Sequence, residues 1–167
     1  MVIMGIDPGT ASTGYGIIEQ STSGLKRLDH GCVRTDPTFD PQKRLLDIFL
    51  SLGKIMDAHR PDAVSIELLF FNKNVTTAIS VGQARGVALL ACAMRNLPVS
   101  EFTPLQVKQA VTGYGRATKQ QVQAMVKAML DLEKPPKPDD AADALAIAIC
   151  CAHHSNPRLA FTEGKSS

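Results

Sequence analysis

The sequence has no tryptophan, and only two tyrosines and six phenylalanines among 167 residues. Proteins that bind single strands by stacking many bases need rows of aromatic side chains, so an extended stacking platform is excluded. Charge of one sign is also lacking, because 18 lysines and arginines stand against 16 aspartates and glutamates, for a net charge of +2. This balance neither requires nor excludes a polyanionic partner, because binding depends on where the charges lie.

Long apolar runs and paired cysteines are missing as well. No stretch approaches the roughly 18 apolar residues of a membrane span, and residues 1–7 carry no secretion signal. The four cysteines form no C-x-x-C pair, which predicts reduced thiols that serve in packing. We therefore expect a cytoplasmic protein with one folded domain at residues 1–155 and a polar, flexible tail at residues 156–167.

Apolar periodicity and turn residues predict an α/β domain. The order of the elements indicates a five-stranded mixed sheet with antiparallel edge strands and helices on both faces. Strands are expected at 2–7, 13–20, 25–34, 62–67 and 99–102, and helices at 41–59, 74–96 and 141–152, with two short helices that open at Pro104 and Lys119. The last helix is apolar nearly all round and should be buried.

Four acids occupy unusual positions in this plan. Asp7 and Glu67 each end a strand, and parallel neighbouring strands would bring them to one edge of the sheet. Asp140 and Asp143 begin the buried helix, and their spacing of three puts both on one helix face. Clustered carboxylates would repel by about 1 to 4 kcal/mol per close pair, which divalent cations relieve. Oxygen ligands favour Mg²⁺ or Mn²⁺, and two such ions can hydrolyse phosphodiesters.

Each acid also has an ordinary structural explanation when it is taken alone. Asp7 precedes a Pro-Gly turn, and an aspartate in a first helical turn is favoured by capping and by the helix dipole. Asp139 is a further acid beside Asp140, although its spacing from Asp143 is less suitable. His153 and His154 are expected to be solvated rather than to bind metal. The coincidence of the four acids favours a metal site.

Short motifs recur in order along the chain, and together they resemble one family. They are 5–10 (Gly-Ile-Asp-Pro-Gly-Thr), 13–16 (Thr-Gly-Tyr-Gly), 66–74, 82–87 (Gly-Gln-Ala-Arg-Gly-Val), 106–109, 113–115, 119–122 and 140–146 (Asp-Ala-Ala-Asp-Ala-Leu-Ala). The set resembles the RuvC Holliday-junction resolvases from about Ile3 to Ile149. The first motif alone is weak, whereas the ordered set is very specific.

The resemblance implies a ribonuclease H-like fold and a homodimer that nicks two opposed strands of a four-way DNA junction with Mg²⁺. It implies that Asp7, Glu67, Asp140 and Asp143 are catalytic metal ligands, for two ions in each active site. It also implies action with the branch-migration proteins RuvA and RuvB. Expected DNA contacts are a wedge that unstacks bases and cations that bind phosphates, namely Phe70 as the wedge, with Lys73, Arg85, Lys108, Arg116 and Lys119.

Three alternatives stay open at this point. The first motif also occurs in actin-type and Hsp70-type ATPases, but those need two such domains around a cleft. A YqgF-like nuclease that acts on RNA shares the first strand, whereas residues 108–146 follow the resolvases. A catalytically silent junction-binding module is the third alternative, and the retention of all four acids argues against it. The helix expected at 74–96 carries small residues at 81–90. They favour a two-fold interface on one face of this helix over burial of that face within the same chain.

Overall fold

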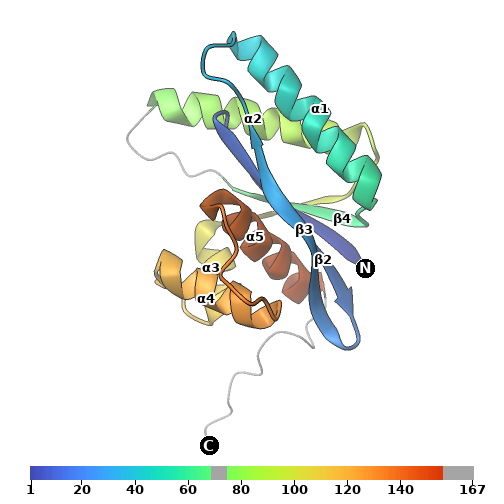
Figure 1. Cartoon of the computed structure of the whole chain (residues 1–167), viewed down its shortest axis with the longest axis vertical. Helices are drawn as coiled ribbons and strands as arrows, with labels where there is room; N and C mark the ends of the chain where they lie inside the picture. The colour runs from blue at the N-terminus through green and yellow to red at the C-terminus, as the bar shows by residue number, and fades with distance from the viewer. Residues whose placement is uncertain (69–74, 156–167) are drawn as a thin grey trace, which may run out of the picture.

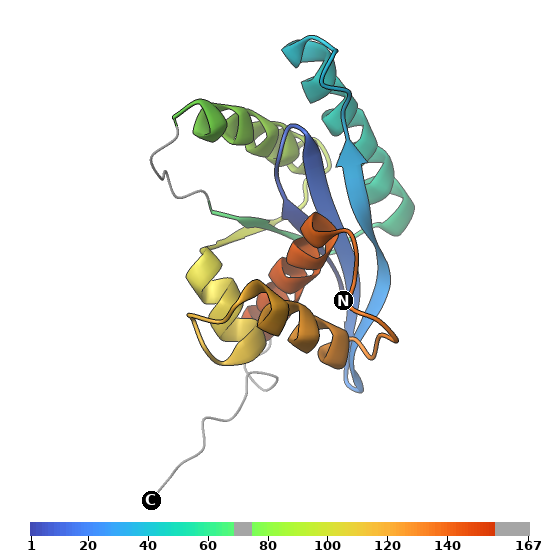
Figure 2. The same cartoon turned by 60° about the vertical axis from the view of Figure 1, so that its left-hand side comes forward.

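The computed structural model describes residues 1–68 and 75–155. The mixed sheet has the strand order β3-β2-β1-β4-β5, and α1 and α2 cover one face while α5, with α3 and α4 beyond it, covers the other (Figures 1 and 2). The predicted α/β class is thereby confirmed. The strands are β1 (Val2–Asp7), β2 (Ser12–Ser21), β3 (Gly24–Arg34), β4 (Ala63–Glu67) and β5 (Val99–Phe102), and the helices are α1 (Pro41–His59), α2 (Val75–Ala93), α3 (Pro104–Thr112), α4 (Lys119–Met129) and α5 (Asp139–Ser155).

Strand pairing determines where the acids meet. β1 is antiparallel to β2, which forms a hairpin with β3, and β1 is parallel to β4 on its other side. In the parallel pair, Ile6 stands opposite Ile66, so the next residues, Asp7 and Glu67, end neighbouring strands at the same edge. β4 is also parallel to β5. Sites in sheets of this kind form beyond the carboxyl ends of the strands.

The short helices begin as their sequence predicts. The side chains of Thr103 and Thr118 each accept a hydrogen bond from the backbone N–H of the third residue of the following helix. The side chains of these third residues, Gln106 and Gln121, accept a hydrogen bond from the backbone N–H of the capping threonine. Asp40 occupies the capping position of α1, but its side chain makes no capping bond.

The start of α5 differs from the prediction. The helix begins at Asp139 rather than at 141, because the carbonyl oxygen of Pro138 accepts hydrogen bonds from the N–H groups of Ala141 and Ala142. Asp139 and Asp140 therefore lie within the first turn instead of capping it. Negative side chains in this turn are stabilised by the helix dipole.

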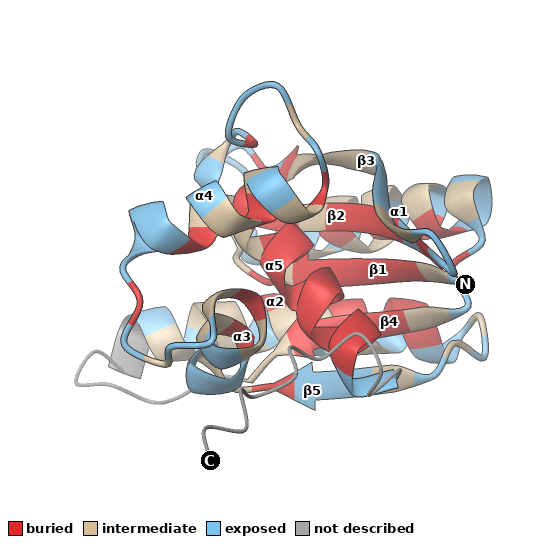
Figure 3. Ribbon diagram, turned by 90° about the horizontal axis from the view of Figure 1, so that it is seen from below, coloured by how far each residue is buried: buried red, intermediate tan, exposed pale blue. Residues whose placement is uncertain are grey.

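The final helix lies in the centre of the molecule, as its composition predicts. Residues 141–152 are buried except for Asp143, and Figure 3 shows α5 lying across the sheet with α3 and α4 beside it. One histidine prediction was wrong. His153 is buried, with 7% of its surface exposed, because Nδ1 donates a hydrogen bond to the carbonyl oxygen of Ala110 in α3. His154 is exposed, as expected.

The cysteines are free thiols, and three of them are buried: Cys92, Cys150 and Cys151. Burial raises the pKa of the Cys150 thiol to about 12, so this side chain is a packing group and not a nucleophile. Among residues 1–68 and 75–155, no helix has the length and apolar character needed to cross a bilayer. The expected tail at 156–167 lies outside the described residues.

Candidate metal centre and DNA-binding surface

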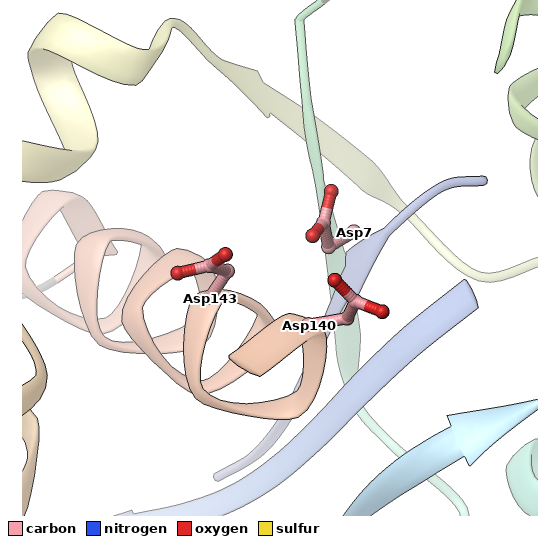
Figure 4. A group of neighbouring side chains, drawn as sticks. All are labelled: Asp7, Asp140 and Asp143. Atoms are coloured by element: carbon pink, nitrogen blue, oxygen red, sulfur yellow. The ribbon is translucent and has the colours of Figure 1, made fainter. Parts of the chain in front are cut away.

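Three aspartates form a compact group at the edge of the sheet. Asp7 ends β1, and Asp140 and Asp143 lie in the first turns of α5. One carboxylate oxygen of each lies within 4.8 Å of the other two, and Figure 4 shows the three side chains gathered where the strand end meets the helix. The structure thus brings together three of the four acids that the sequence singles out, from positions more than 130 residues apart.

Glu67 stands beside this triplet without belonging to it. It ends β4 next to Asp7 and lines a pocket together with Asp143. Burial and the charge of Asp143 raise the pKa of its carboxyl, against the opposing charge of Lys108. Glu67, on the strand next to β1, therefore interacts electrostatically with the aspartates of the triplet.

The crowding of negative charge is strongest at Asp7. Burial, followed by the charges of Glu67, Asp143 and Asp140, raises the pKa of Asp7 to about 8. The pKa of Asp143 is also raised, chiefly by burial. A carboxyl group with a pKa raised this much is protonated near neutral pH unless a cation lies beside it.

Lys119 supplies a positive charge to the group in this structure. Its ammonium lies 3.0 Å from Oδ2 of Asp143 and 3.4 Å from Oδ2 of Asp139. Asp139 itself is exposed, accepts a hydrogen bond from Gln123, and lies outside the triplet. The geometry thus groups Asp140, and not Asp139, with Asp7 and Asp143.

A pocket of about 240 Å³ opens beside the acids. Two acids and two cations line it, Glu67, Asp143, Lys108 and Lys119, and the other lining residues are apolar. α3 and α4 each contribute their first turn to this pocket, so their positive helix ends lie beside it. Cations and apolar surface beside an acidic centre suit a nucleotide backbone whose phosphate approaches the acids.

The remaining predicted DNA contacts are distributed differently. Arg116 is exposed in the loop between α3 and α4. Arg85 lies in α2, on the opposite face of the sheet, where its guanidinium forms an ion pair of 2.6 Å with Glu101 of β5. The structure therefore does not bring Arg85 together with Lys108 and Lys119. Phe70 and Lys73 lie outside the described residues.

Sequence reasoning did not single out Thr13, which supports the turn after Asp7. Its side chain is fully buried, and its Oγ1 donates a 2.6 Å hydrogen bond to the carbonyl oxygen of Gly9. Oγ1 of Thr13 also accepts a longer hydrogen bond, of 3.4 Å, from the backbone N–H of Gly9. A threonine that begins an alternating Thr-Gly-Tyr-Gly strand directly after a turn is the signal that could have indicated this role.

The donor set fits a hard divalent cation. The triplet offers only carboxylate oxygens, which Mg²⁺ and Mn²⁺ prefer, and it contains neither the histidine nor the cysteine that zinc favours. A bound cation would also offset the charge that raises the pKa of Asp7. The site therefore has the ligands of a metal centre, and its clustered negative charges would be stabilised by a bound cation.

A sheet of order β3-β2-β1-β4-β5, with an acidic group where β1 meets the last helix, defines a ribonuclease H-like nuclease. Residues 3–151 match the model of the family described as crossover junction endodeoxyribonuclease RuvC. The chain belongs to this RuvC family, whose members are metal-dependent endonucleases.

Individual relatives agree with the family match. The chain is 60% identical to the crossover junction endodeoxyribonuclease RuvC of Heliobacterium modesticaldum, over 92% of this chain and 94% of that protein. It is 56% identical to the RuvC of Pelotomaculum thermopropionicum, over the same shares of the two chains. The solved Thermus thermophilus RuvC in complex with Holliday junction substrate superposes with a TM-score of 0.89 at 35% identity, over 95% of this chain and 96% of that chain. These matches favour the resolvase over the YqgF-like alternative.

Proposed function

We propose that this endonuclease resolves four-way DNA junctions in recombination and repair by paired, symmetric hydrolysis of phosphodiester bonds, with Mg²⁺ held by Asp7, Glu67, Asp140 and Asp143. The observation that carries the proposal is the aspartate triplet beside Glu67, in which one oxygen of each carboxylate lies within 4.8 Å of the other two. Two cations in such a site, when bound, activate a water and stabilise the leaving oxygen. Mn²⁺ has the same ligand preference and should substitute.

The protein's own groups position the strand. Lys108 and Lys119 line the pocket and would bind phosphates on either side of the bond that is cut. Arg116, exposed in the loop before α4, would extend this contact along the backbone. Lys73, Arg85 and the Phe70 wedge complete the proposed set, on the strength of the family resemblance. The complex of the Thermus thermophilus protein with a Holliday junction supports binding of a junction by this chain.

A homodimer is the second part of the proposal. α2 presents Ala84, Ala88, Ala91 and Cys92 to the sheet, where all four are fully buried. Its opposite face is apolar yet exposed, with Ile79 at 59% and Leu90 at 54% exposure and Gly86 between them. Two copies of this face, packed about a two-fold axis, would match the two-fold symmetry of a four-way junction.

The remaining elements of the proposal follow from the family. Residues 1–155 form the nuclease domain, with the tail beyond it. The protein acts in the cytoplasm with the branch-migration proteins RuvA and RuvB, as its family resemblance implies. A pull-down of RuvA and RuvB from the same organism on a preformed protein–junction complex tests this partnership, and a duplex-bound control should retain neither.

A cleavage assay tests the function itself. The purified protein is incubated with a labelled four-way junction or with a linear duplex of matched sequence, with Mg²⁺, with Mn²⁺, or with a chelator. We expect symmetric nicks in the junction only when metal is present, and an intact duplex. Asp7→Asn should abolish cleavage and leave junction binding in chelator within about twofold, because it removes a ligand but none of the cations.

Two outcomes would contradict the proposal in different ways. Junction binding without cleavage in either metal would make the chain the silent binding module considered above. Unchanged cleavage by Asp7→Asn would remove Asp7 from the centre and leave the family assignment intact. Cleavage of RNA in preference to junction DNA would favour the YqgF-like activity.

A further inference from the structure

Three glycines form the part of the sheet on which α5 rests. In the register of β1 and β2, Gly5 stands directly opposite Gly16, and Asp7 stands directly opposite Gly14. None of the three adopts a positive φ, since the described glycines that do are Gly24 and Gly113. Backbone freedom therefore does not explain their presence, and a close approach of another segment does.

That segment is the backbone of α5. A Cβ atom at Gly14 would overlap the carbonyl oxygen of Asp140 and lie 3.1 Å from the backbone nitrogen of Ala141. A Cβ atom at Gly5 would overlap the carbonyl oxygen of Ala144. At Gly16 it would lie 2.7 Å from the backbone nitrogen of Leu145. Backbone atoms cannot rotate away as side chains do, so a methyl group here must move the helix.

Gly14 differs from the other two in its neighbours. It is the cross-strand partner of Asp7, and the peptide unit of Asp140 packs directly against it. Gly14 therefore contacts both β1 and α5 at the point where Asp7 of β1 and Asp140 of α5 contribute carboxylates to one centre. The distance between Asp7 and Asp140 depends on how closely α5 approaches β2 at this glycine.

The far part of α5 is held by separate bonds. The hydroxyl of Ser65 in β4 donates a hydrogen bond of 3.2 Å to the carbonyl oxygen of Ile147. The side-chain amide of Gln20 in β2 donates one of 3.0 Å to the carbonyl oxygen of Ala152. Extra volume at Gly14 would therefore lift the first turn of the helix while its later turns stay attached. The displacement would fall on Asp140 and Asp143.

We propose that Gly14 is a positioning residue for the metal centre: its missing side chain sets the depth of the first turn of α5, and so brings Asp140 within coordinating reach of the ion that Asp7 also binds. Coordination tolerates errors of only a few tenths of an ångström. Supports of metal ligands typically change affinity by 10- to 100-fold when they are altered. This inference rests on the metal centre of the proposed function.

The first experiment is Mn²⁺ binding to the DNA-free protein, followed by calorimetry and by the rise in Tm that Mn²⁺ causes. Gly14→Ala should bind Mn²⁺ at least tenfold more weakly than the wild type, while junction binding in chelator stays within twofold. Gly16→Ala is the matched control, because it lies on the same strand and the same face but meets Leu145, which is not a ligand. It should lower Tm by a similar amount and weaken Mn²⁺ binding less than threefold.

A second variant keeps the inference testable if Gly14→Ala does not fold. Asp140 is only partly buried, so Asp140→Glu should fold, and its longer side chain should weaken Mn²⁺ binding tenfold if the depth of the helix is set for an aspartate. In the Gly14→Ala background the same glutamate should restore part of the lost affinity, because it spans the wider gap.

The outcomes separate the two proposals. Wild-type affinity in Gly14→Ala, equal losses in Gly14→Ala and Gly16→Ala, or wild-type affinity in Asp140→Glu would each overturn the role of Gly14. Unchanged Mn²⁺ binding in Asp7→Asn, or none in the wild type, would instead overturn the metal centre itself. Loss of binding in Asp7→Asn with full binding in Gly14→Ala would refute only the present inference.

Discussion

The ammonium group of Lys119 lies 3.0 Å from Oδ2 of Asp143, a proposed metal ligand. The hydrogen bonds and charges of Asp143 and Asp139 raise the pKa of Lys119 and outweigh the opposing effect of its burial. The same lysine lines the pocket that would receive the DNA backbone. When a phosphate and metal ions bind, we expect Lys119 to exchange its carboxylate partners for the phosphate.

Removal of Lys119 should therefore weaken DNA binding through charge. We expect Lys119→Ala to reduce the slope of log binding constant against log salt concentration by about 1, as the loss of one phosphate contact predicts. Fluorescence anisotropy with a labelled junction in chelator measures this slope. Lys54→Ala is the control, because Lys54 is an exposed lysine of α1 on the far side of the sheet. An unchanged slope for Lys119→Ala would exclude the phosphate contact.

The raised pKa of Asp7 predicts how stability depends on pH. Its folded pKa, about 8, exceeds the ordinary value of 3.8, so the protonated form is favoured in the folded state. The metal-free protein should therefore be most stable below about pH 4 with respect to this group, and lose that contribution as the pH rises to about 8. A shift of this size corresponds to about 6 kcal/mol. Glu67 and Asp143 act in the same direction.

Urea unfolding in chelator between pH 5 and pH 8.5 measures this effect. Asp7→Asn should show a shallower loss of unfolding free energy than the wild type, and it should be the more stable of the two at pH 8. Saturating Mg²⁺ should restore wild-type stability at pH 8 but do little for Asp7→Asn. A steeper loss in the variant would mean that Asp7 is ionised in the folded protein at neutral pH.

The buried hydroxyl of Thr13 should contribute measurably to stability. Thr13→Val keeps the shape of the side chain but removes the hydrogen bond to the carbonyl oxygen of Gly9. We expect a loss of about 1 to 2 kcal/mol in unfolding free energy, because a buried acceptor is left without its partner. Thr13→Ser retains the hydroxyl and should lose less. If serine and valine cost the same, the methyl group and not the hydrogen bond is what stabilises the turn.

The exposed face of α2 predicts the oligomeric state. Leu90→Glu places a charge within the proposed two-fold interface, where two copies would bring like charges together. The variant should sediment as a monomer at concentrations at which the wild type is a dimer. Leu50→Glu, on α1, is the matched control because Leu50 is similarly exposed, at 49% against 54%. A dimer that survives Leu90→Glu, or one that Leu50→Glu disrupts, would place the interface elsewhere.

Much of this fold could be predicted because local patterns carry it. The capping boxes at Thr103 and Thr118 begin helices where expected, and an acid at the end of each of the parallel strands β1 and β4 brings Asp7 and Glu67 to one edge. The spacing of Asp140 and Asp143 put both on one helix face, and the triplet confirms that they meet Asp7.

What could not be predicted depends on contacts between distant segments. The burial of His153 arises from a carbonyl oxygen of α3, and the pairing of Arg85 with Glu101 joins α2 to β5. The bond between Lys119 and Asp143 joins two helices whose packing no local pattern states. The sequence showed Gly14 as part of a motif, but only the position of α5 above it shows what its missing side chain is for.

The alanines of α5 also bear on how this protein can diverge from its relatives. Ala141, Ala144, Ala148 and Ala152 are fully buried in the helix that carries two of the acids. Because these positions are buried in a packed core, a larger side chain at any of them should push the helix away from the sheet or from α3 and α4. We therefore expect few substitutions at these four positions to leave the stability of the protein unchanged. Divergence in junction preference among relatives should accumulate instead in α3, in α4 and in the loop that joins them, where exposed side chains can vary without disturbing the carboxylates.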